Sequence, residues 1–310
     1  MRVSVVLCTH SLDRYDDLLD AADSVRAQTY ENVELVLVSD GNDEVTERFE
    51  WDFGADGDTV VTELPENRGL LEARNHGADA ATGDVVAFLD DDAIADPDWV
   101  AELVEAYEHR GAIAAGGKMV PEWVAGKPGF LPEEFYWLIG VTHRGFGPDG
   151  DVEKAGEVRN TNGSNISFDR EVFLELGGFD TDIGGRKGDN NLQGGETELC
   201  ARLQKEYGQG VWYNPRAVVA HKVFEYRTDV RWLLDRAFWQ GYSKRAMETF
   251  VEDSTDEETD FLERLLTEFA PERFRSAVTS PSKSAITQLV MLFVLTGTVG
   301  AGYLYGARRY

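Results

Sequence analysis

The feature that most constrains the fold is an alternation of short apolar runs with longer amphipathic stretches in the first half of the chain. Four runs rich in β-branched residues have the composition of buried strands, at residues 3–8, 33–38, 59–64 and 85–89. Residues 13–27 and 70–81 carry apolar side chains at helical spacing. Strands that alternate with helices pair in parallel through right-handed crossovers. The chain is therefore predicted to be an α/β protein with a mostly parallel sheet flanked by helices.

The later part of the chain gives weaker patterns. Residues 118–159 are rich in glycine, proline and aromatic side chains and are expected to be an irregular, substrate-facing insertion. Strands are predicted at 112–116, 163–168 and 217–223. Helices are predicted at 98–109, 170–176, 196–207 and 229–250, followed by an acidic linker at 252–260. No repeat with the period of a solenoid or propeller is present in the sequence.

An uncharged segment near the end of the sequence predicts membrane attachment. Residues 285–306 contain no charged side chain and would span about 33 Å as a helix, close to the thickness of a bilayer core. Polar Gln288 and several threonines and glycines leave a buried core helix or a re-entrant anchor as alternatives. The first residues run directly into an apolar strand, so no secretory signal is expected. The predicted parts are 1–117, 118–227, 228–283 and a transmembrane or anchoring helix at 284–307.

The charge balance excludes one class of partner. The sequence has 57 acidic and 30 basic residues, a formal charge of −27. Such a surface repels phosphate backbones, so nucleic-acid binding is not expected and a phosphate ligand would need a metal. The acidity is spread along the chain, which favours adaptation to high salt, as in salt-loving archaea, over an ordinary acidic protein. Two cysteines, Cys8 and Cys200, are too few for a disulfide framework and favour a reducing compartment.

The strongest local signal is the triplet Asp90, Asp91 and Asp92 directly after a predicted strand. Adjacent carboxylates repel one another unless water or a cation neutralises them, and their hard oxygen ligands suit Mg²⁺ or Mn²⁺. The alternative is a solvated acidic turn before a helix. Thr9 and Asp40 follow two other parallel strands, and ligands bind at such carboxyl ends. A nucleotide pocket at this edge is therefore predicted, in which Arg68 or Arg74 would pair with diphosphate oxygens.

Several of these segments resemble the family 2 glycosyltransferases, which have the GT-A fold and inverting chemistry. The resemblance covers about residues 1 to 225. It is carried by VSVVLCTHSLDR at 3–14, VLVSDGN at 36–42, NRGLLEARN at 67–75, FLDDD at 88–92 and NGSNISFDREVFLELGGFD at 162–180. The Gln-x-x-Arg-Trp motif of processive polysaccharide synthases is absent from the sequence, which argues against a polymerase.

The resemblance implies roles for individual residues. It implies that Thr9 and Asp40 hold the nucleoside, that Arg68 lies near the diphosphate and that Asp91 contacts ribose or metal. Asp92 would be the main metal ligand, with Asp90 and His221 as further ligands of Mg²⁺ or Mn²⁺. The segment GETELCAR at 195–202 resembles the family's base motif, so that Glu196 is expected to be the catalytic base and Glu198 is its rival.

The implied reaction moves a hexose or hexuronic acid from a nucleoside-diphosphate sugar, such as UDP-glucuronate, to a lipid-linked acceptor. Because the acidity indicates an archaeon, the expected carrier is dolichol phosphate, in protein N-glycosylation or cell-surface glycan assembly. The catalytic domain would face the cytoplasm from the cell membrane. A dolichyl-phosphate sugar synthase, a non-catalytic membrane-tethered carbohydrate-binding protein and a nucleotidyltransferase remain alternatives.

Overall fold

The structure is a computed structural model that describes residues 1–187, 190–250 and 256–309, and it divides into two compact units. Unit 1 consists of Met1–Pro121, Glu153–Gly185 and Gly195–Lys222, and unit 2 of Glu122–Val152, Arg186–Gly194 and Val223–Tyr310. The chain therefore passes several times between the units. The division at residues 117, 227 and 283 remains a prediction.

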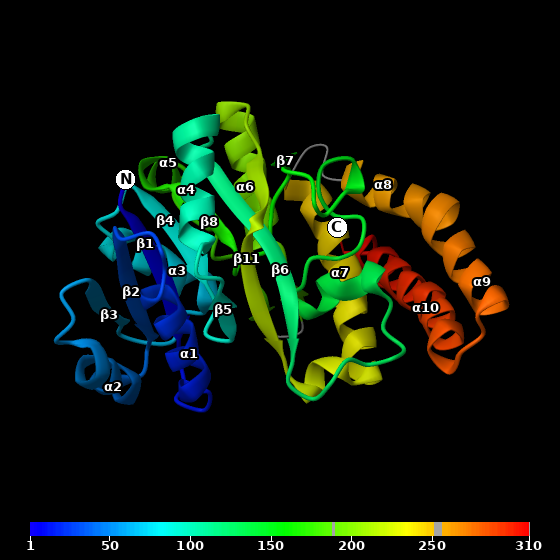
Figure 1. The fold of residues 1–310 in the computed structure, drawn as a ribbon, viewed down its shortest axis with the longest axis horizontal. Helices are drawn as coiled ribbons and strands as arrows, with labels where there is room; N and C mark the ends of the chain where they lie inside the picture. Colours follow the sequence, from blue (N-terminus) through cyan, green and yellow to red (C-terminus); the bar gives the residue numbers. More distant parts are fainter. Residues whose placement is uncertain (188–189, 251–255, 310) are drawn as a thin grey trace. The chain divides into compact units, whose positions relative to one another are not determined.

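Unit 1 is built on a mixed sheet (Figure 1). Strands β1 (Val3–Thr9), β2 (Val33–Asp40), β3 (Thr59–Leu64) and β4 (Val85–Leu89) are parallel, in the order β3–β2–β1–β4. The sheet continues through β8 (Ile166–Asp169), β6 (Ala114–Trp123), β11 (Val211–Val223) and β5 (Ala93–Ala95), with β7 (Gly156–Val158) beside β11. In this second half, β8 is antiparallel to β4 and β6, and β11 is antiparallel to β5 and β7. The predicted α/β class and parallel half are confirmed.

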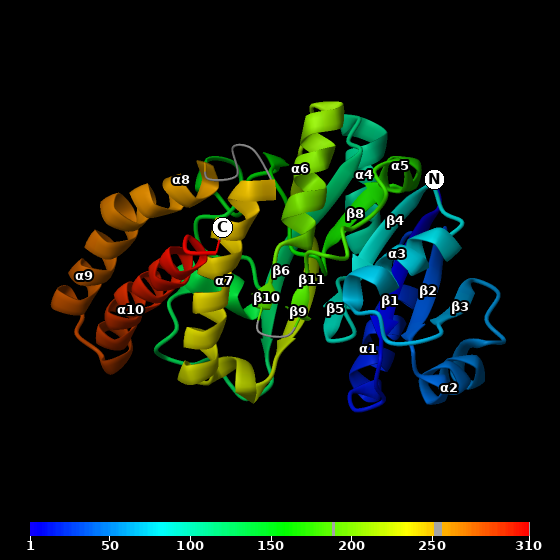
Figure 2. The ribbon, with the colours of Figure 1, turned by 180° about the vertical axis from the view of Figure 1, so that it is seen from behind.

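Helices cover both faces of the sheet because successive strand residues point to opposite sides. On one face, Val5 and Leu7 pack with α1 (Tyr15–Arg26), α2 (Asp43–Phe53) and α4 (Trp99–Arg110). On the other face, Val6 and Phe88 pack with α3 (Leu70–Ala80), α5 (Arg170–Glu175) and α6 (Gly195–Tyr207), as Figure 2 shows from behind. This arrangement leaves the carboxyl ends of β1, β2 and β4 at one edge of the sheet, where Thr9, Asp40 and the aspartate triplet lie.

Unit 2 is mainly helical. It contains the 3₁₀ helices η1 (Glu133–Ile139), η2 (Pro148–Gly150) and η3 (Glu225–Thr228) and the short strands β9 (Gly185–Lys187) and β10 (Asn190–Leu192). Its longer helices are α7 (Val230–Phe250), α8 (Asp256–Arg264), the π-helical turn η4 (Leu265–Phe269), α9 (Ala270–Thr279) and α10 (Lys283–Gly306). The core joins η1, α7, η4 and α10 through residues such as Phe135, Leu233, Phe269 and Leu292.

Three expectations from the sequence need correction. Helix α2 was not foreseen, although Asn42 caps it and Val45, Phe49 and Phe53 form its buried stripe. Residues 118–159 are not wholly irregular, because β6 extends to Trp123 and η1, η2 and β7 follow. The acidic linker at 252–260 is wrong over its second part, where α8 begins at Asp256, and residues 251–255 lie outside the described residues.

Candidate active site

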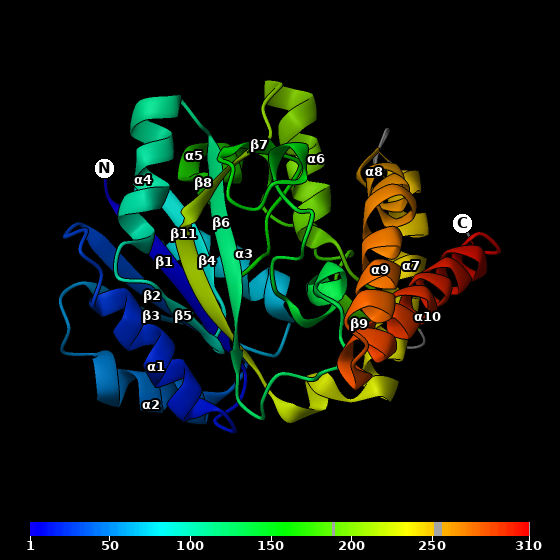
Figure 3. The same cartoon turned by 45° about the vertical axis from the view of Figure 1, so that its right-hand side comes forward.

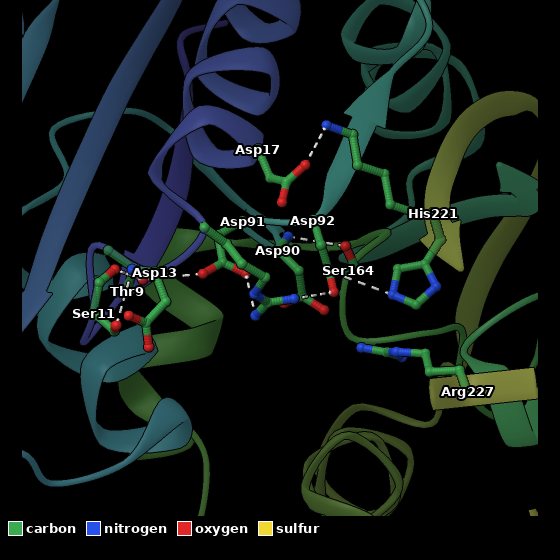
Figure 4. A network of polar contacts seen from close by, with 12 residues as sticks. Thr9, Ser11, Asp13, Asp17, Asp90, Asp91, Asp92, Ser164, His221 and Arg227 are labelled. Carbon is green, nitrogen blue, oxygen red and sulfur yellow. Dashed lines mark hydrogen bonds and ion pairs between the residues drawn. The ribbon is translucent and has the colours of Figure 1, made fainter. Parts of the chain in front are cut away.

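Asp91 and Asp92 share one guanidinium at the carboxyl edge of the sheet (Figure 4). Arg14, which precedes α1, donates to Asp91 Oδ1 at 3.2 Å and to Asp92 Oδ2 at 2.9 Å. Thr9 Oγ1, at the end of β1, donates to Asp91 Oδ2 at 3.0 Å. Burial and the neighbouring carboxylates Asp92 and Asp90 raise the pKa of Asp91 to about 6, although Arg14 and Thr9 act to lower it. Burial is the largest of these causes, so the surroundings of Asp91 disfavour its charged form.

The register of the sheet brings His221 to Asp92. In the antiparallel β5–β11 pair, His221 lies opposite Ala93, and the N–H of Lys222 donates to the backbone oxygen of Asp92 at 2.9 Å. His221 Nε2 is consequently 3.3 Å from Asp92 Oδ1, and both side chains are 4% exposed. The Lys222 ammonium donates to Asp17 and Asp20 of α1, at 2.7 and 2.6 Å, which fixes this end of β11.

Asp90 points to a different partner. Arg74 of α3, whose side chain is 3% exposed, donates to Asp90 Oδ1 at 2.7 Å and to Glu196 Oε1 at 2.9 Å. Burial alone would lower the pKa of Arg74, but Asp90 and Glu196 more than compensate, so its pKa is raised. The backbone N–H of Asp90 donates to Ser164 Oγ at 2.9 Å. One buried guanidinium thus joins the aspartate triplet to the expected base.

Glu196 and its rival Glu198 have different surroundings on α6. The carboxylate of Glu198 is bound by the guanidinium of Arg202 at 2.6 and 2.7 Å and is nearly buried. Glu196 has a side chain that is 24% exposed and accepts from Arg74 through one oxygen. A Cβ atom at Gly163 would lie 1.9 Å from Glu196 Oε1, so the backbone of Gly163 closes this side of the carboxylate. Of the two, Glu196 has the geometry of a base open to a substrate.

Asp40 lies at the end of β2 and holds the loop before α3. Its two carboxylate oxygens accept from the backbone N–H groups of Arg68 at 2.7 Å and Gly69 at 2.9 Å. Each oxygen keeps a second lone pair for a ligand. The Arg68 side chain is 56% exposed and pairs with Glu66 at 3.1 Å, so it extends from the loop into solvent. Asp40 and Arg68 are therefore adjacent, as a shared donor site requires.

The donor atoms around Asp92 meet part of what a divalent cation needs. Across residues 1–187, 190–250 and 256–309, no group of three or more His, Cys, Asp and Glu side chains is arranged to hold a metal. Asp92 and His221 supply an oxygen and a nitrogen side by side, and His221 Nδ1 is buried without a hydrogen-bond partner. The carboxylate oxygens of the triplet are hard ligands of the kind that Mg²⁺ and Mn²⁺ prefer. Both predicted aspartate ligands already contact an arginine, Asp90 through Arg74 and Asp92 through Arg14.

Sequence reasoning missed the roles of Arg14, Ser164 and Gly163. Arg14 lies in the first motif at 3–14, but no pattern in that segment indicates that its guanidinium returns to the triplet. The sequence offers Arg68 or Arg74 as the diphosphate partner, and in the structure Arg74 joins Asp90 to Glu196. The signal that points to Arg74 is its place between the apolar residues Ala73 and Ala78 on a buried helix face. An arginine on such a face needs a carboxylate partner.

Comparisons with known proteins agree with this geometry. Residues 4–177 match the sequence family described as "Glycosyl transferase family 2". A protein of Haloferax volcanii described as glucosyl-dolichyl phosphate glucuronosyltransferase is 50% identical over 307 residues, which cover 99% of this chain and 96% of that protein.

Two solved structures share the fold. A mannosyltransferase from Pyrobaculum calidifontis in complex with GDP-Man and Mn²⁺ has a TM-score of 0.63 at 19% identity, covering 98% of this chain and 87% of that one. GalNAc-T7 with UDP, GalNAc and Mn²⁺ has a TM-score of 0.56 at 18% identity, covering 85% and 54%. The GT-A fold expected from the sequence is confirmed. The chain belongs to glycosyl transferase family 2 and is a glycosyltransferase.

Proposed function

We propose that this glycosyltransferase moves glucuronate from UDP-glucuronate to glucosyl-dolichyl phosphate, with inversion at the sugar's anomeric carbon and with help from Mg²⁺ or Mn²⁺. The observation that carries the proposal is the 50% identity, over 99% of the chain, to a protein described by that transfer. The site chemistry supports it independently, because the guanidinium of Arg74 contacts both Asp90 of the triplet and Glu196, whose carboxylate is open to substrate. The lipid-linked acceptor agrees with the apolar helix α10.

The donor would bind along the edge from Asp40 to the triplet. The Asp40 carboxylate would accept hydrogen bonds from the nucleoside, and the Thr9 hydroxyl would donate one to it. Asp91 would contact the ribose, and Arg68 would pair with diphosphate oxygens. Asp92 and His221, with Asp90 beside them, would hold the divalent cation. Such a cation, when bound, stabilises the negative charge of the departing diphosphate. The catalytic unit would face the cytoplasm, where nucleotide sugars are made.

Glu196 would act as the general base. The acceptor hydroxyl oxygen bonds to the anomeric carbon while the bond from that carbon to the diphosphate oxygen breaks, and the hydroxyl proton passes to Glu196. Arg74 holds this carboxylate through one oxygen, at 2.9 Å, and leaves the other for the hydroxyl. Burial of Arg74 keeps the pair fixed before substrate arrives, which preserves the orientation needed for proton transfer.

A transfer assay tests the proposal. The full chain, in membranes at high salt, is given labelled UDP-glucuronate, UDP-glucose or GDP-mannose with either glucosyl-dolichyl phosphate or dolichyl phosphate. Label from UDP-glucuronate should enter the lipid fraction only with glucosyl-dolichyl phosphate and a divalent cation. The Asp92→Ala variant is the matched inactive control. Transfer to dolichyl phosphate itself would identify a dolichyl-phosphate sugar synthase, and no transfer from any donor would favour a carbohydrate-binding protein.

A further inference from the structure

Helix α10 has one face that packs against protein along much of its length. Leu292 and Leu295 are fully buried in the core of unit 2. Farther along, α10 meets α7 backbone to backbone, because a Cβ at Gly302 would lie 1.9 Å from the Phe238 carbonyl oxygen and one at Gly241 would lie 1.9 Å from that of Val299. Glycines at these positions allow the close approach. This face of α10 cannot contact lipid.

The helix that packs on α10 is too polar to enter a bilayer core. Six charged residues lie in α7 within 21 residues: Arg231, Asp235, Arg236, Lys244, Arg245 and Glu248. Glu248 accepts a hydrogen bond from Tyr303 of α10 at 2.7 Å. If α10 crossed a membrane, α7 would have to enter the hydrocarbon beside it, and charged side chains are costly there.

A second charged cluster lies under the start of α10. Glu134 is fully buried and accepts from Arg273 of α9 at 2.8 Å, and Arg273 also donates to Gln288 of α10. The first turns of α10 therefore rest on an ion pair. A membrane-spanning position would place this pair at the depth of the bilayer as well. The length and composition of α10 are sufficient to span, but its packing is that of a helix at the surface of a water-soluble unit.

The opposite face of α10 is an exposed apolar stripe. Its large side chains recur at helical spacing and are each at least 40% exposed: Ile286, Val290, Phe293, Val294 and Leu304. Gly297 and Gly300 lie between them, and a Cβ at either would meet no neighbour within 4 Å. Apolar exposure that runs the length of a helix marks an interaction surface.

The preceding helices repeat this pattern. Leu262, Leu266, Phe274 and Val278 occur at multiples of four residues through α8, η4 and α9, and are 49%, 68%, 62% and 64% exposed. A spacing of four exceeds the helical period, so such residues would drift around an α-helix. The π-helical turn η4 takes more residues per turn and offsets that drift. Helices α9 and α10 contact each other as a hairpin joined by three residues (Figure 3).

The net charge of the α9–α10 hairpin is opposite in sign to that of the rest of the chain. Residues 270–310 contain five basic residues, Arg273, Arg275, Lys283, Arg308 and Arg309, and one acidic residue, Glu272, a net charge of +4. The whole chain has −27, so the remaining residues carry −27 − 4 = −31. An anionic lipid surface would attract the α9–α10 hairpin and repel the remaining residues, including α8 and η4, where residues 256–269 contain six acidic side chains and one basic side chain.

We infer that the α9–α10 hairpin binds in the plane of one face of a lipid bilayer with anionic headgroups. Its apolar stripes enter the headgroup and acyl boundary, and its exposed basic residues Arg275, Lys283 and Arg308 pair with lipid phosphates, whereas Arg273 stays paired with Glu134. Both ends of α10 then lie on the same side of the membrane, and α10 does not span it. In-plane membrane binding does not depend on which sugar is transferred. If the membrane assay fails, the proposed transfer still stands, and if the transfer assay fails, the membrane inference still stands.

Two cysteine variants of the full chain distinguish an in-plane helix from a spanning one. Ser280→Cys and Ala307→Cys flank α10 at exposed positions without altering its charge. Cys8 and Cys200 are buried, so background labelling is low. Purified protein is added to sealed vesicles of phosphatidylglycerol and phosphatidylcholine and treated with a membrane-impermeant maleimide. Both variants should be labelled from outside. Labelling of Ala307→Cys only after permeabilisation, or protection of both sites, would overturn the inference.

A flotation assay with the same vesicles tests the face itself. The double variant Val290→Glu, Phe293→Glu should bind at least about tenfold more weakly than the unmodified chain. Trp51→Glu is the matched control, because Trp51 of α2 is 83% exposed yet lies outside the stripes, and its binding should be unchanged. Circular dichroism and UDP binding report folding. Failure of the unmodified chain to float, or a dimer that the double variant dissolves, would assign the face to another partner and refute lipid binding.

Discussion

Replacing Glu196 by glutamine separates its chemical role from its structural one. The amide oxygen of glutamine can still accept from Arg74, so the contact at 2.9 Å survives without the negative charge. Loss of charge assistance should lower the free energy of unfolding by about 1 kcal/mol. An amide cannot take the acceptor proton, and general-base assistance is typically worth about 10²–10⁴-fold. Turnover should therefore fall by that factor, equivalent to about 2.7–5.5 kcal/mol in the activation barrier.

Glu198→Gln is the matched control. The Glu198 carboxylate is bound by Arg202 through two contacts, and Arg202 also donates to the backbone oxygens of Leu176 and Gly178. Its neutralisation should reduce stability by about 2 kcal/mol, because hydrogen bonds between charged groups contribute more than neutral ones. The turnover of the folded protein should stay within a few-fold of the unmodified value.

The measurements are the rate of label transfer to glucosyl-dolichyl phosphate at saturating donor, the affinity for UDP, and urea unfolding. UDP affinity should be nearly unchanged in both variants, since neither glutamate is placed at the donor. Full turnover by Glu196→Gln would refute the assignment of the base and favour an acceptor that is already anionic, such as dolichyl phosphate. Loss of turnover only in Glu198→Gln would transfer the role to that residue.

Three further predictions concern metal, geometry and pH. Asp92→Ala should lower turnover at least about a hundredfold and weaken Mn²⁺ binding, followed by electron paramagnetic resonance; unchanged Mn²⁺ affinity would remove Asp92 from the ligands. Gly163→Ala should displace the Glu196 carboxylate, because the added Cβ would lie 1.9 Å from Glu196 Oε1, and should reduce turnover about tenfold to a hundredfold with little change in UDP binding; equal rates would show that this displacement does not affect catalysis. Burial and two nearby basic side chains lower the pKa of His143 to about 3, so the unfolded chain binds a proton near pH 6.5 before the folded chain does. Stability should fall as the pH drops below 6.5, by about 1–2 kcal/mol at pH 5 given the partial exposure of His143, and this slope should disappear from urea titrations of His143→Gln.

The parallel half of unit 1 could be predicted from the sequence alone. Runs such as 33–38 are mainly apolar on both faces, which is typical of a parallel strand covered by helices on both sides. Asp90 to Asp92 directly follow the end of such a run. The family resemblance added the GT-A fold, which the structure and its neighbours confirm. The roles assigned to individual site residues remain predictions.

Long-range partners could not be predicted. Arg14 lies 78 residues from Asp92 in the sequence, and Arg74 lies 16 residues from Asp90. Local sequence patterns do not predict contacts between residues this far apart. The contact between His221 and Asp92 depends on the antiparallel register of β5 and β11, and β5 has only three residues. Helix α8 was hidden because its acidic composition resembles that of a linker, whereas its partners for packing lie elsewhere in unit 2.

The turn after β2 has a consequence for altering nucleotide preference. Gly41 has φ +70°, and a Cβ there would lie 2.0 Å from the backbone nitrogen of Asn67, so the turn and the loop before α3 touch through their main chains. Asp40 also ties the two together by its bonds to Arg68 and Gly69. If the nucleotide binds here as proposed, neither segment can move independently of the other to admit a bulkier purine. Libraries aimed at a different nucleobase should therefore diversify outward side chains such as Arg68 and Glu66, and leave the length of both segments untouched.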